Sequence, residues 1–199
     1  AMIDEELRQQ LNQVLETGNQ AYIDSVMLRI FDDEMRLLRG AKAQRERMKM
    51  MLLTTGAISI TANGQSYDYN YGMSSEHQKD VATAWSNAAA PIIDDIRGWQ
   101  DMIEEETGTR PDRAIVNSKT MAYFTNNTAI RNAIWGNNSA APVSRGKVLS
   151  YVLEELGLTL RVYSKKYIDE AGAKKQYVPD DLFVLFPSGE LGTGWFGTT

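Results

Sequence analysis

The residues that could carry out chemistry are few and widely spaced in this sequence. The chain has one histidine, His77, and no cysteine. Cysteine nucleophiles, thiolate zinc sites and disulfides are therefore excluded, and metal sites built from several histidines are disfavoured. A catalytic triad needs a serine and an acid beside its histidine, and no spacing assigns such partners to His77. We expect no catalytic residues, no cofactor and no metal ion.

Three motif lookalikes lack the context that would give them a chemical role. Residues 192–197 have the G-x-G-x-x-G spacing of a dinucleotide loop, but that loop needs a helix directly after it, and only two residues follow. Residues 104–106 are three glutamates that could offer oxygens to Mg²⁺ or Ca²⁺, but consecutive helical side chains point in different directions. Gly146-Lys147 resembles the end of a phosphate-binding loop, except that the upstream glycine position holds Ala141. We therefore expect that the chain is not an enzyme.

Length and charge narrow the class of protein further. The chain has 199 residues, of which 43% are hydrophobic, and this length suits one domain or two small ones. Its formal charge of −5 argues against a protein that coats nucleic acid over its whole surface. No apolar run approaches the ~18 residues of a membrane span, and the acidic N-terminus is not a secretory signal. We expect a soluble mixed α and β protein, cytoplasmic or particle-associated.

A basic segment forms the second half of a long helix that Gly56 ends. Residues 35–56 contain six basic residues and one acidic residue, a net charge of +5, so the rest of the chain carries −10. One arc of this helix is apolar, and we expect it to be buried: Leu37, Leu38, Ala41, Met48, Met51 and Leu52. Five basic residues lie outside that arc and form the candidate contact face: Arg36, Arg39, Lys42, Arg47 and Lys49. Met50 also lies outside the arc, on the polar side of the helix. This face either meets a polyanion or an acidic partner, or is simply solvated.

A β-hairpin follows the helix at residues 57–71. Asn63-Gly64 is the preferred pair for a two-residue type I′ turn, which pairs Ala62 with Gln65. Alternation then places Ile58, Ile60 and three tyrosines on one face. This aromatic face could stack bases, but without interleaved basic residues we interpret it as a packing face.

The other predicted elements come from apolar spacing and capping residues. Before the basic segment, we expect a helix at residues 3–15. After the hairpin, a capping box at residues 75–78 predicts a helix to Trp85, and Pro91 suits the first position of a helix that Gly108 ends. The remaining predictions are strands at 113–117, 158–168, 176–178 and 182–186, and a loop at 136–143. One further helix is capped by Ser118 and broken at 126–127, and another is capped by Ser144.

The order of these parts resembles a known family. Its elements, in chain order, are Thr54-Thr55-Gly56, Ser66-Tyr67-Asp68-Tyr69, Ala84-Trp85-Ser86, Pro91-Ile92-Ile93-Asp94-Asp95-Ile96, Gly108-Thr109-Arg110-Pro111-Asp112-Arg113-Ala114-Ile115-Val116-Asn117, Tyr167-Ile168-Asp169-Glu170-Ala171-Gly172 and Tyr177-Val178-Pro179-Asp180-Asp181, ahead of the apolar 182–186 strand. Their shared order is more specific than any one of them. The chain resembles the major capsid protein E family of tailed phages and prophages, the lambda-type major head protein, from about Arg29 onward.

The resemblance implies an α+β fold of the tailed-phage major capsid type. In that fold the basic helix is the spine helix, and the hairpin belongs to a peripheral domain. The implied division is 1–84 for the N-terminal helices, spine helix and hairpin of the peripheral domain, 85–186 for an axial α/β domain, and 187–199 for a return segment. The family's N-terminal arm and extended loop are not recognisable here, so we expect this chain to be a fragment that lacks them.

The resemblance also implies a structural function. The expected role is a subunit of an icosahedral phage or prophage capsid that self-assembles into the head shell around double-stranded DNA. Its partners would be copies of itself, with scaffold or decoration proteins, and it would enclose DNA without sequence-specific binding and contact no membrane. Its location would be the virion, and the bacterial host cytoplasm before assembly.

Two alternatives from other classes stay open at this point. One is an α/β enzyme or ligand-binding domain that uses the helix N-termini at Pro91 or Ser144 as anion sites in a concave pocket. The other is a nucleic-acid-binding module that uses the basic helix at residues 36–49, which predicts binding that weakens steeply with salt.

Overall fold

We analysed a computed structural model of the chain, which describes Gln9, Asn12 and residues 20–62, 64–136, 141–169 and 171–194. The chain divides into two compact units, Ala1–Met48 and Lys49–Thr199. The helix predicted at residues 3–15 lies outside the described residues.

A single long helix, α2, runs over Gln20–Thr55 and crosses the boundary between the units. Gly56 ends it, as predicted, with a left-handed φ of 68° that favours glycine. A Cβ atom at this position would collide with the side chain of Met73. In the last turn, the hydroxyls of Thr54 and Thr55 donate to the carbonyl oxygens of Met50 and Met51, each at 2.8 Å. These hydroxyls bond back to main-chain carbonyls one turn earlier, as threonine commonly does inside a helix.

The predicted hairpin is confirmed in position and register. Strands β1 (Ala57–Ala62) and β2 (Gln65–Asn70) pair antiparallel, with Ala62 opposite Gln65 and Ile58 opposite Tyr69. Gly64 has a φ of 75°, as a turn of this kind requires.

The segment after the hairpin differs from the prediction. Only a 3₁₀ turn forms at Ser75–His77, and the cap is Ser74, whose hydroxyl accepts from the main-chain N–H of Glu76 at 3.2 Å. Val81 and Trp85 pack against the main core instead of continuing a helix. A short helix gains little by itself, so the burial of Trp85 decides the path of this segment.

Four helices of the second unit follow. They are α3 (Ile92–Thr107), α4 (Ser118–Asn126), α5 (Thr128–Trp135) and α6 (Arg145–Leu156). Pro91 is the N-cap of α3, so the helix begins at Ile92, one residue later than predicted, and Gly108 ends it with a φ of 71°. The predicted break at residues 126–127 and the Ser144 cap are confirmed, with Gly157 closing α6.

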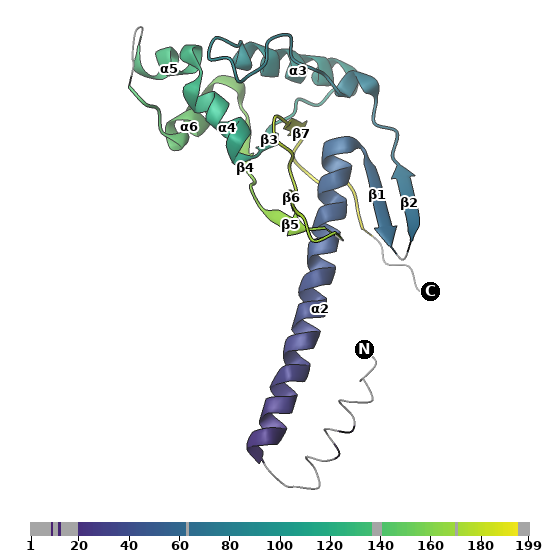
Figure 1. Cartoon of the computed structure of the whole chain (residues 1–199). Coiled ribbons are helices and arrows are strands. Elements are labelled where there is room, and N and C mark those ends of the chain that lie inside the picture. Colours follow the sequence, from purple (N-terminus) through teal and green to yellow (C-terminus); the bar gives the residue numbers. More distant parts are fainter. Residues whose placement is uncertain are drawn as a thin grey trace. The chain divides into compact units, whose positions relative to one another are not determined.

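A three-stranded sheet lies among these helices, in the order β4-β3-β7. Strand β3 (Arg113–Val116) pairs parallel with β4 (Thr159–Val162) and antiparallel with β7 (Phe183–Phe186). The register places Ala114 opposite both Leu160 and Leu185. The crossover between the parallel strands contains α4, α5 and α6, which contact one another (Figure 1).

Two strand predictions were wrong in their bounds. The strand predicted at 158–168 divides into β4 and β5 (Lys166–Ile168), and the return strand β6 is Lys174–Gln176, not residues 176–178. Strands β5 and β6 form a separate antiparallel pair. The chain leaves the larger sheet because Tyr177 and Val178 are buried with Met50 in a second, smaller cluster, against which Tyr163 and Tyr167 pack.

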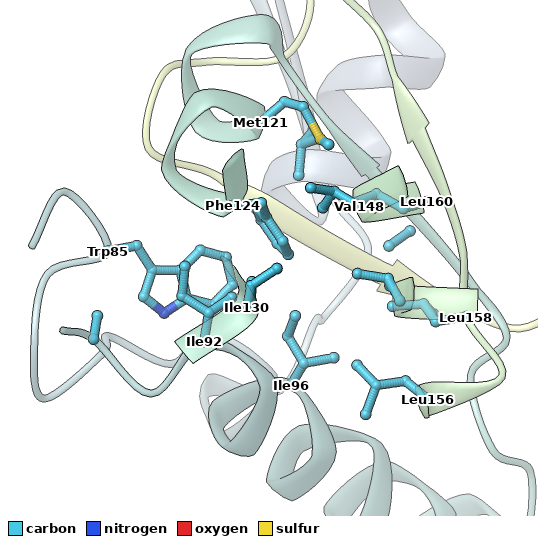
Figure 2. Packing of buried hydrophobic residues seen from close by; sticks show 14 of the residues in the cluster. Trp85, Ile92, Ile96, Met121, Phe124, Ile130, Val148, Leu156, Leu158 and Leu160 are labelled. Carbon is cyan, nitrogen blue, oxygen red and sulfur yellow. The ribbon is translucent and has the colours of Figure 1, made fainter. Parts of the chain in front are cut away.

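The main core joins the four helices to the sheet. Figure 2 shows side chains from α3, α4, α5, α6 and β4 converging on one region, together with Trp85 from the preceding loop. Ile92, Ile96, Phe124 and Ile130 are among its fully buried members. At about 25 cal/mol per Å² of apolar surface removed from water, this burial is the dominant stabilising contribution to the unit.

An aromatic cluster occupies one end of this core. The ring centroid of Trp85 lies 5.6 Å from that of Trp99, 5.4 Å from that of Phe124 and 5.3 Å from that of Phe183. The indole N–H of Trp85 donates to Asp95 at 2.8 Å, so its one polar atom is satisfied. Trp85 therefore holds the incoming loop, α3, α4 and β7 together.

Truncating Phe124 to alanine should destabilise the second unit strongly. We expect Phe124→Ala to lower the free energy of unfolding by about 3–5 kcal/mol, because it leaves a cavity between Trp85 and Phe183. Urea unfolding followed by tryptophan fluorescence measures the change. The control is Leu153→Ala on α6, where the side chain is 51% exposed and the expected loss is within about 0.5 kcal/mol. Equal losses in the two variants would contradict this description of the core.

Candidate functional site

The five basic residues of the predicted contact face do not share one environment. Arg36, Arg39 and Lys42 are exposed on α2 within the first unit, and Arg36 lies 3.9 Å from the carboxylate of Asp33. Arg47 is half-buried, and Lys49 is exposed but belongs to the second unit. The exposed part of the predicted face in the first unit is therefore Arg36, Arg39 and Lys42.

The apolar arc predicted on α2 is only partly buried. Leu37 and Leu38 are 65% and 56% exposed, and Ala41 is also exposed, whereas Met48, Met51 and Leu52 are half-buried. Met50, predicted on the polar side, is buried against Tyr177 and Val178. The helical period reveals which residues share a face, but it does not say which part of that face a neighbouring element covers.

A second apolar stripe on α2, which shares Leu38 with the predicted arc, was not recognised from the sequence as one face. Leu28, Phe31, Met35 and Leu38 follow one another at spacings of three, four and three, and all four side chains are exposed. Lys42 continues the same stripe one turn further on. The signal that would have found it is this alternating spacing, which places all five residues on one helix face.

The hairpin tyrosines are exposed instead of packed. Tyr67, Tyr69 and Tyr71 are 45%, 57% and 64% exposed, whereas Ile58 on the same face is buried. The interpretation of this face as a packing face is therefore wrong for its tyrosines in the part of the chain that the structure describes.

The groups weighed for chemistry make structural contacts. His77 Nε2 lies 2.7 Å from a carboxylate oxygen of Glu106, and both residues are exposed. Glu104 contacts Arg110 at 2.6 Å. Among the described residues, no cluster of three or more histidine, aspartate or glutamate side chains could hold a metal ion. The hydroxyl of Ser144 accepts from the N–H of Lys147 at 3.4 Å, so it caps its own helix.

A dense polar cluster surrounds Asn117, which follows β3. Its side-chain oxygen caps α4 by accepting from the N–H of Thr120 at 2.8 Å, although Ser118 had been predicted as the cap. Its amide nitrogen donates to the carbonyl of Pro179 at 3.0 Å and to the carboxylate of Asp180 at 2.6 Å. Asn117 is fully buried. One side chain thus joins a helix N-terminus to the chain that leads into β7.

Asp180 and Asp181 are held as carboxylates by this cluster. Hydrogen bonds from Gln176 and Asn117 lower the pKa of Asp180 below its ordinary value. Hydrogen bonds from the Tyr123 hydroxyl at 2.5 Å and from Lys119 at 3.1 Å lower the pKa of Asp181. Asp181 adopts a left-handed φ of 62°, which aspartate tolerates better than most residues. These contacts fix the turn that leads into β7.

A comparison with protein families decides what this arrangement belongs to. The sequence profile of the family described as phage major capsid protein E matches residues 3–198. The chain belongs to the phage major capsid protein E family. No curated protein sequence matches the chain.

The fold of this family member agrees with a solved structure. It matches the crystal structure of a protein assigned as a prophage capsid protein of E. coli CFT073, with a TM-score of 0.61 and 21% sequence identity. The match covers 83% of this chain and 50% of that protein, so the chain spans about half the length of its structural relative. The predicted α+β fold of the phage capsid type is confirmed.

The family is described as one of phage major capsid proteins, and the role that this description gives is structural. Among the described residues, no helix combines the length and the apolar character that crossing a membrane would need. The exposed faces of α2 and of the hairpin are the candidate contact surfaces among the described residues.

Replacing Asn117 should destabilise the second unit of this capsid protein. Asn117→Ala removes the cap of α4 and leaves buried polar groups without their partner, and we expect a loss of about 2–3 kcal/mol in the free energy of unfolding. The matched control is Asn126→Ala, an exposed position at the last residue of α4. Urea unfolding followed by circular dichroism compares the two. A loss at Asn117 no larger than at Asn126 would rule out the proposed importance of the cap.

Proposed function

We propose that this chain is part of a structural subunit of an icosahedral phage or prophage capsid, which self-assembles into the head shell that encloses double-stranded DNA. The observation that carries the proposal is the family match over residues 3–198. The fold shared with a prophage capsid protein supports it.

The physical character of the chain suits this role. A closed shell forms when many copies bury complementary surfaces, and each contact can be weak because every subunit has several neighbours. The net charge of −5 suits a wall that encloses DNA without sequence-specific binding and without adhering to it. The large exposed apolar residues of α2 and of the hairpin suit a protein that buries them only on assembly.

The finer parts of the proposal extend the family description. The peripheral domain comprises residues 1–84, the axial α/β domain residues 85–186, and the return segment residues 187–199. Within the peripheral domain, α2 is the spine helix. The partners are copies of this chain together with scaffold or decoration proteins. The subunit resides in the bacterial host cytoplasm until it assembles.

The contact face includes the basic residues of α2. Their positive charge attracts acidic surfaces on neighbouring subunits, which carry the negative charge of the remaining chain. The residues are Arg36, Arg39, Lys42, Arg47 and Lys49. Neither the ligand-binding alternative nor the nucleic-acid-binding alternative gains a supporting observation from the fold or the comparisons.

Expression of the full-length protein by itself tests the function directly. We expect negative-stain electron microscopy of the purified protein to reveal closed shells or tubes of uniform wall thickness. A gel shift at low salt with double-stranded DNA serves as the second measurement. Strong DNA binding that falls steeply between low and moderate salt, in the absence of any ordered assembly, would favour the nucleic-acid-binding alternative and contradict the proposal.

Charge reversal on α2 tests the contact face. We expect Arg36→Glu, Arg39→Glu and Lys42→Glu combined to impair shell assembly while the fold stays intact, because all three side chains are exposed. Arg47 is left unchanged since it is half-buried. The matched control exchanges the same residues without changing their charge, as Arg36→Lys, Arg39→Lys and Lys42→Arg. Normal particles from the reversed variant would eliminate the basic face as a contact.

A further inference from the structure

Strand β2 is an open edge of the hairpin sheet. All six of its residues are exposed, and β1 is its one neighbour in the sheet among the described residues. Proteins commonly protect such an edge with proline or with several charged side chains, but β2 contains no proline and one charged residue, Asp68. An edge of this kind can accept a further strand through main-chain hydrogen bonds.

The register of the hairpin determines which main-chain groups face the open edge. The N–H of Tyr71 donates to the carbonyl of Gly56 at 3.0 Å, and hydrogen-bonded pairs alternate along an antiparallel ladder. Tyr67 and Tyr69 therefore bond to β1. The residues between them direct their N–H and carbonyl groups to the open edge: Ser66, Asp68 and Asn70.

Asp68 and Asn70 have unused hydrogen-bonding capacity on one face of β2. The side-chain oxygen of Asn70 accepts from the N–H of Gly72 at 2.8 Å, and its amide nitrogen makes no hydrogen bond within the described part of the chain. Each carboxylate oxygen of Asp68 accepts one hydroxyl, from Ser59 and from Ser66. A carboxylate can accept about four hydrogen bonds, so Asp68 keeps acceptor sites for a further donor.

We infer that β2 pairs antiparallel with β2 of a second copy of this chain, about a two-fold axis at Tyr69. This inference rests on the proposed function, because it names the partner of the hairpin in the shell. The alignment places Asp68 opposite Asn70 of the second copy, so that the free amide donates to the carboxylate, and the axis repeats this contact. On the other face, Tyr67 lies opposite Tyr71 of the second copy.

The proposed alignment is more favourable than the neighbouring ones. An antiparallel pair centred on Asp68 would place the two Asp68 carboxylates opposite each other. A pair centred on Tyr67 would place Asn70 opposite the turn at Gly64 and retain one pair of facing tyrosines. The proposed alignment gives three facing pairs of tyrosines and no facing carboxylates. A nucleic acid is a poorer occupant, because residues 57–71 contain no basic side chain.

Cysteine pairing in the 199-residue chain tests the alignment, because this sequence contains no cysteine. Tyr69 would lie opposite its own copy in a pair without main-chain hydrogen bonds, in which the Cα atoms are about 4.5 Å apart. A disulfide can span this separation. We expect Tyr69→Cys to form a disulfide-linked homodimer on a non-reducing gel after mild oxidation.

Two exposed positions provide controls for this cross-link. Tyr67→Cys lies on the same face of the same strand, but its two copies would be about 14 Å apart along the paired strands, so it should give little homodimer. Mixed with Tyr71→Cys, it should cross-link, because those two positions face each other. Leu153→Cys on α6 gives the background from random collision. Circular dichroism verifies that each variant is folded.

A charge change tests the polar contact. Asn70→Asp places a carboxylate opposite Asp68 twice in each dimer, and the new side chain can still accept from the N–H of Gly72. In the Tyr69→Cys chain, we expect this change to lower the rate of disulfide formation roughly fivefold. Asp68→Asn added to the same chain exchanges the two side chains, and should restore most of the rate.

Three outcomes would overturn the inference. Tyr67→Cys homodimers as abundant as those of Tyr69→Cys would exclude the proposed alignment. Tyr69→Cys chains that cross-link no more than Leu153→Cys would show that β2 does not pair with its own copy. An unchanged rate with Asn70→Asp would exclude the contact with Asp68. The proposed function is judged separately by electron microscopy: shells without the cross-link refute only the strand pair, and the cross-link without shells refutes only the capsid function.

Discussion

The structure of the second unit depends on the burial of one short strand, β3. Ala114 and Val116 are completely buried, and the strand has a partner on each side. Buried main-chain groups must be hydrogen-bonded, so β4 and β7 are required on its two edges. A parallel partner needs a long crossover, which the chain supplies with three helices, whereas β7 returns antiparallel at the end of the chain. The main core forms where side chains of this sheet and of the helices pack against one another.

Polar groups in this fold are used to hold the backbone in place. Asn117 satisfies the first turn of α4 and the turn before β7, and the buried Gln100 donates to the carbonyls of Pro111 and Leu156 at 2.8 and 3.2 Å. Such groups stabilise because burying them unpaired would cost about 1–3 kcal/mol each. The buried polar clusters therefore fix the path of the main chain in this unit. Residues outside the core are the ones left for contacts with partners.

The sequence predicted those elements whose signals are local. The hairpin register follows from Asn63-Gly64 and the alternation beside it, and the ends of α3 and α6 follow from Gly108 and Gly157. The division between β4 and β5 could not be predicted, because it depends on the packing of Tyr177 and Val178 against Met50. For the candidate site, charge identified Arg36, Arg39 and Lys42. The apolar stripe beside them escaped, because periodicity alone does not distinguish a face that packs within the chain from one left for a partner.

The topology of the sheet also sets the time at which the second unit can be completed during synthesis. Helix α2 and the β1–β2 hairpin are made of contacts between residues close in sequence, so they can form early on the ribosome. Strand β3 has to wait for β7, which is translated last of the three strands. A nascent chain therefore exposes its helix to other chains before its sheet exists. Crowding on a polysome would then favour premature association between neighbouring chains. Chaperones that retain the chain until residue 186 has emerged would separate folding from assembly.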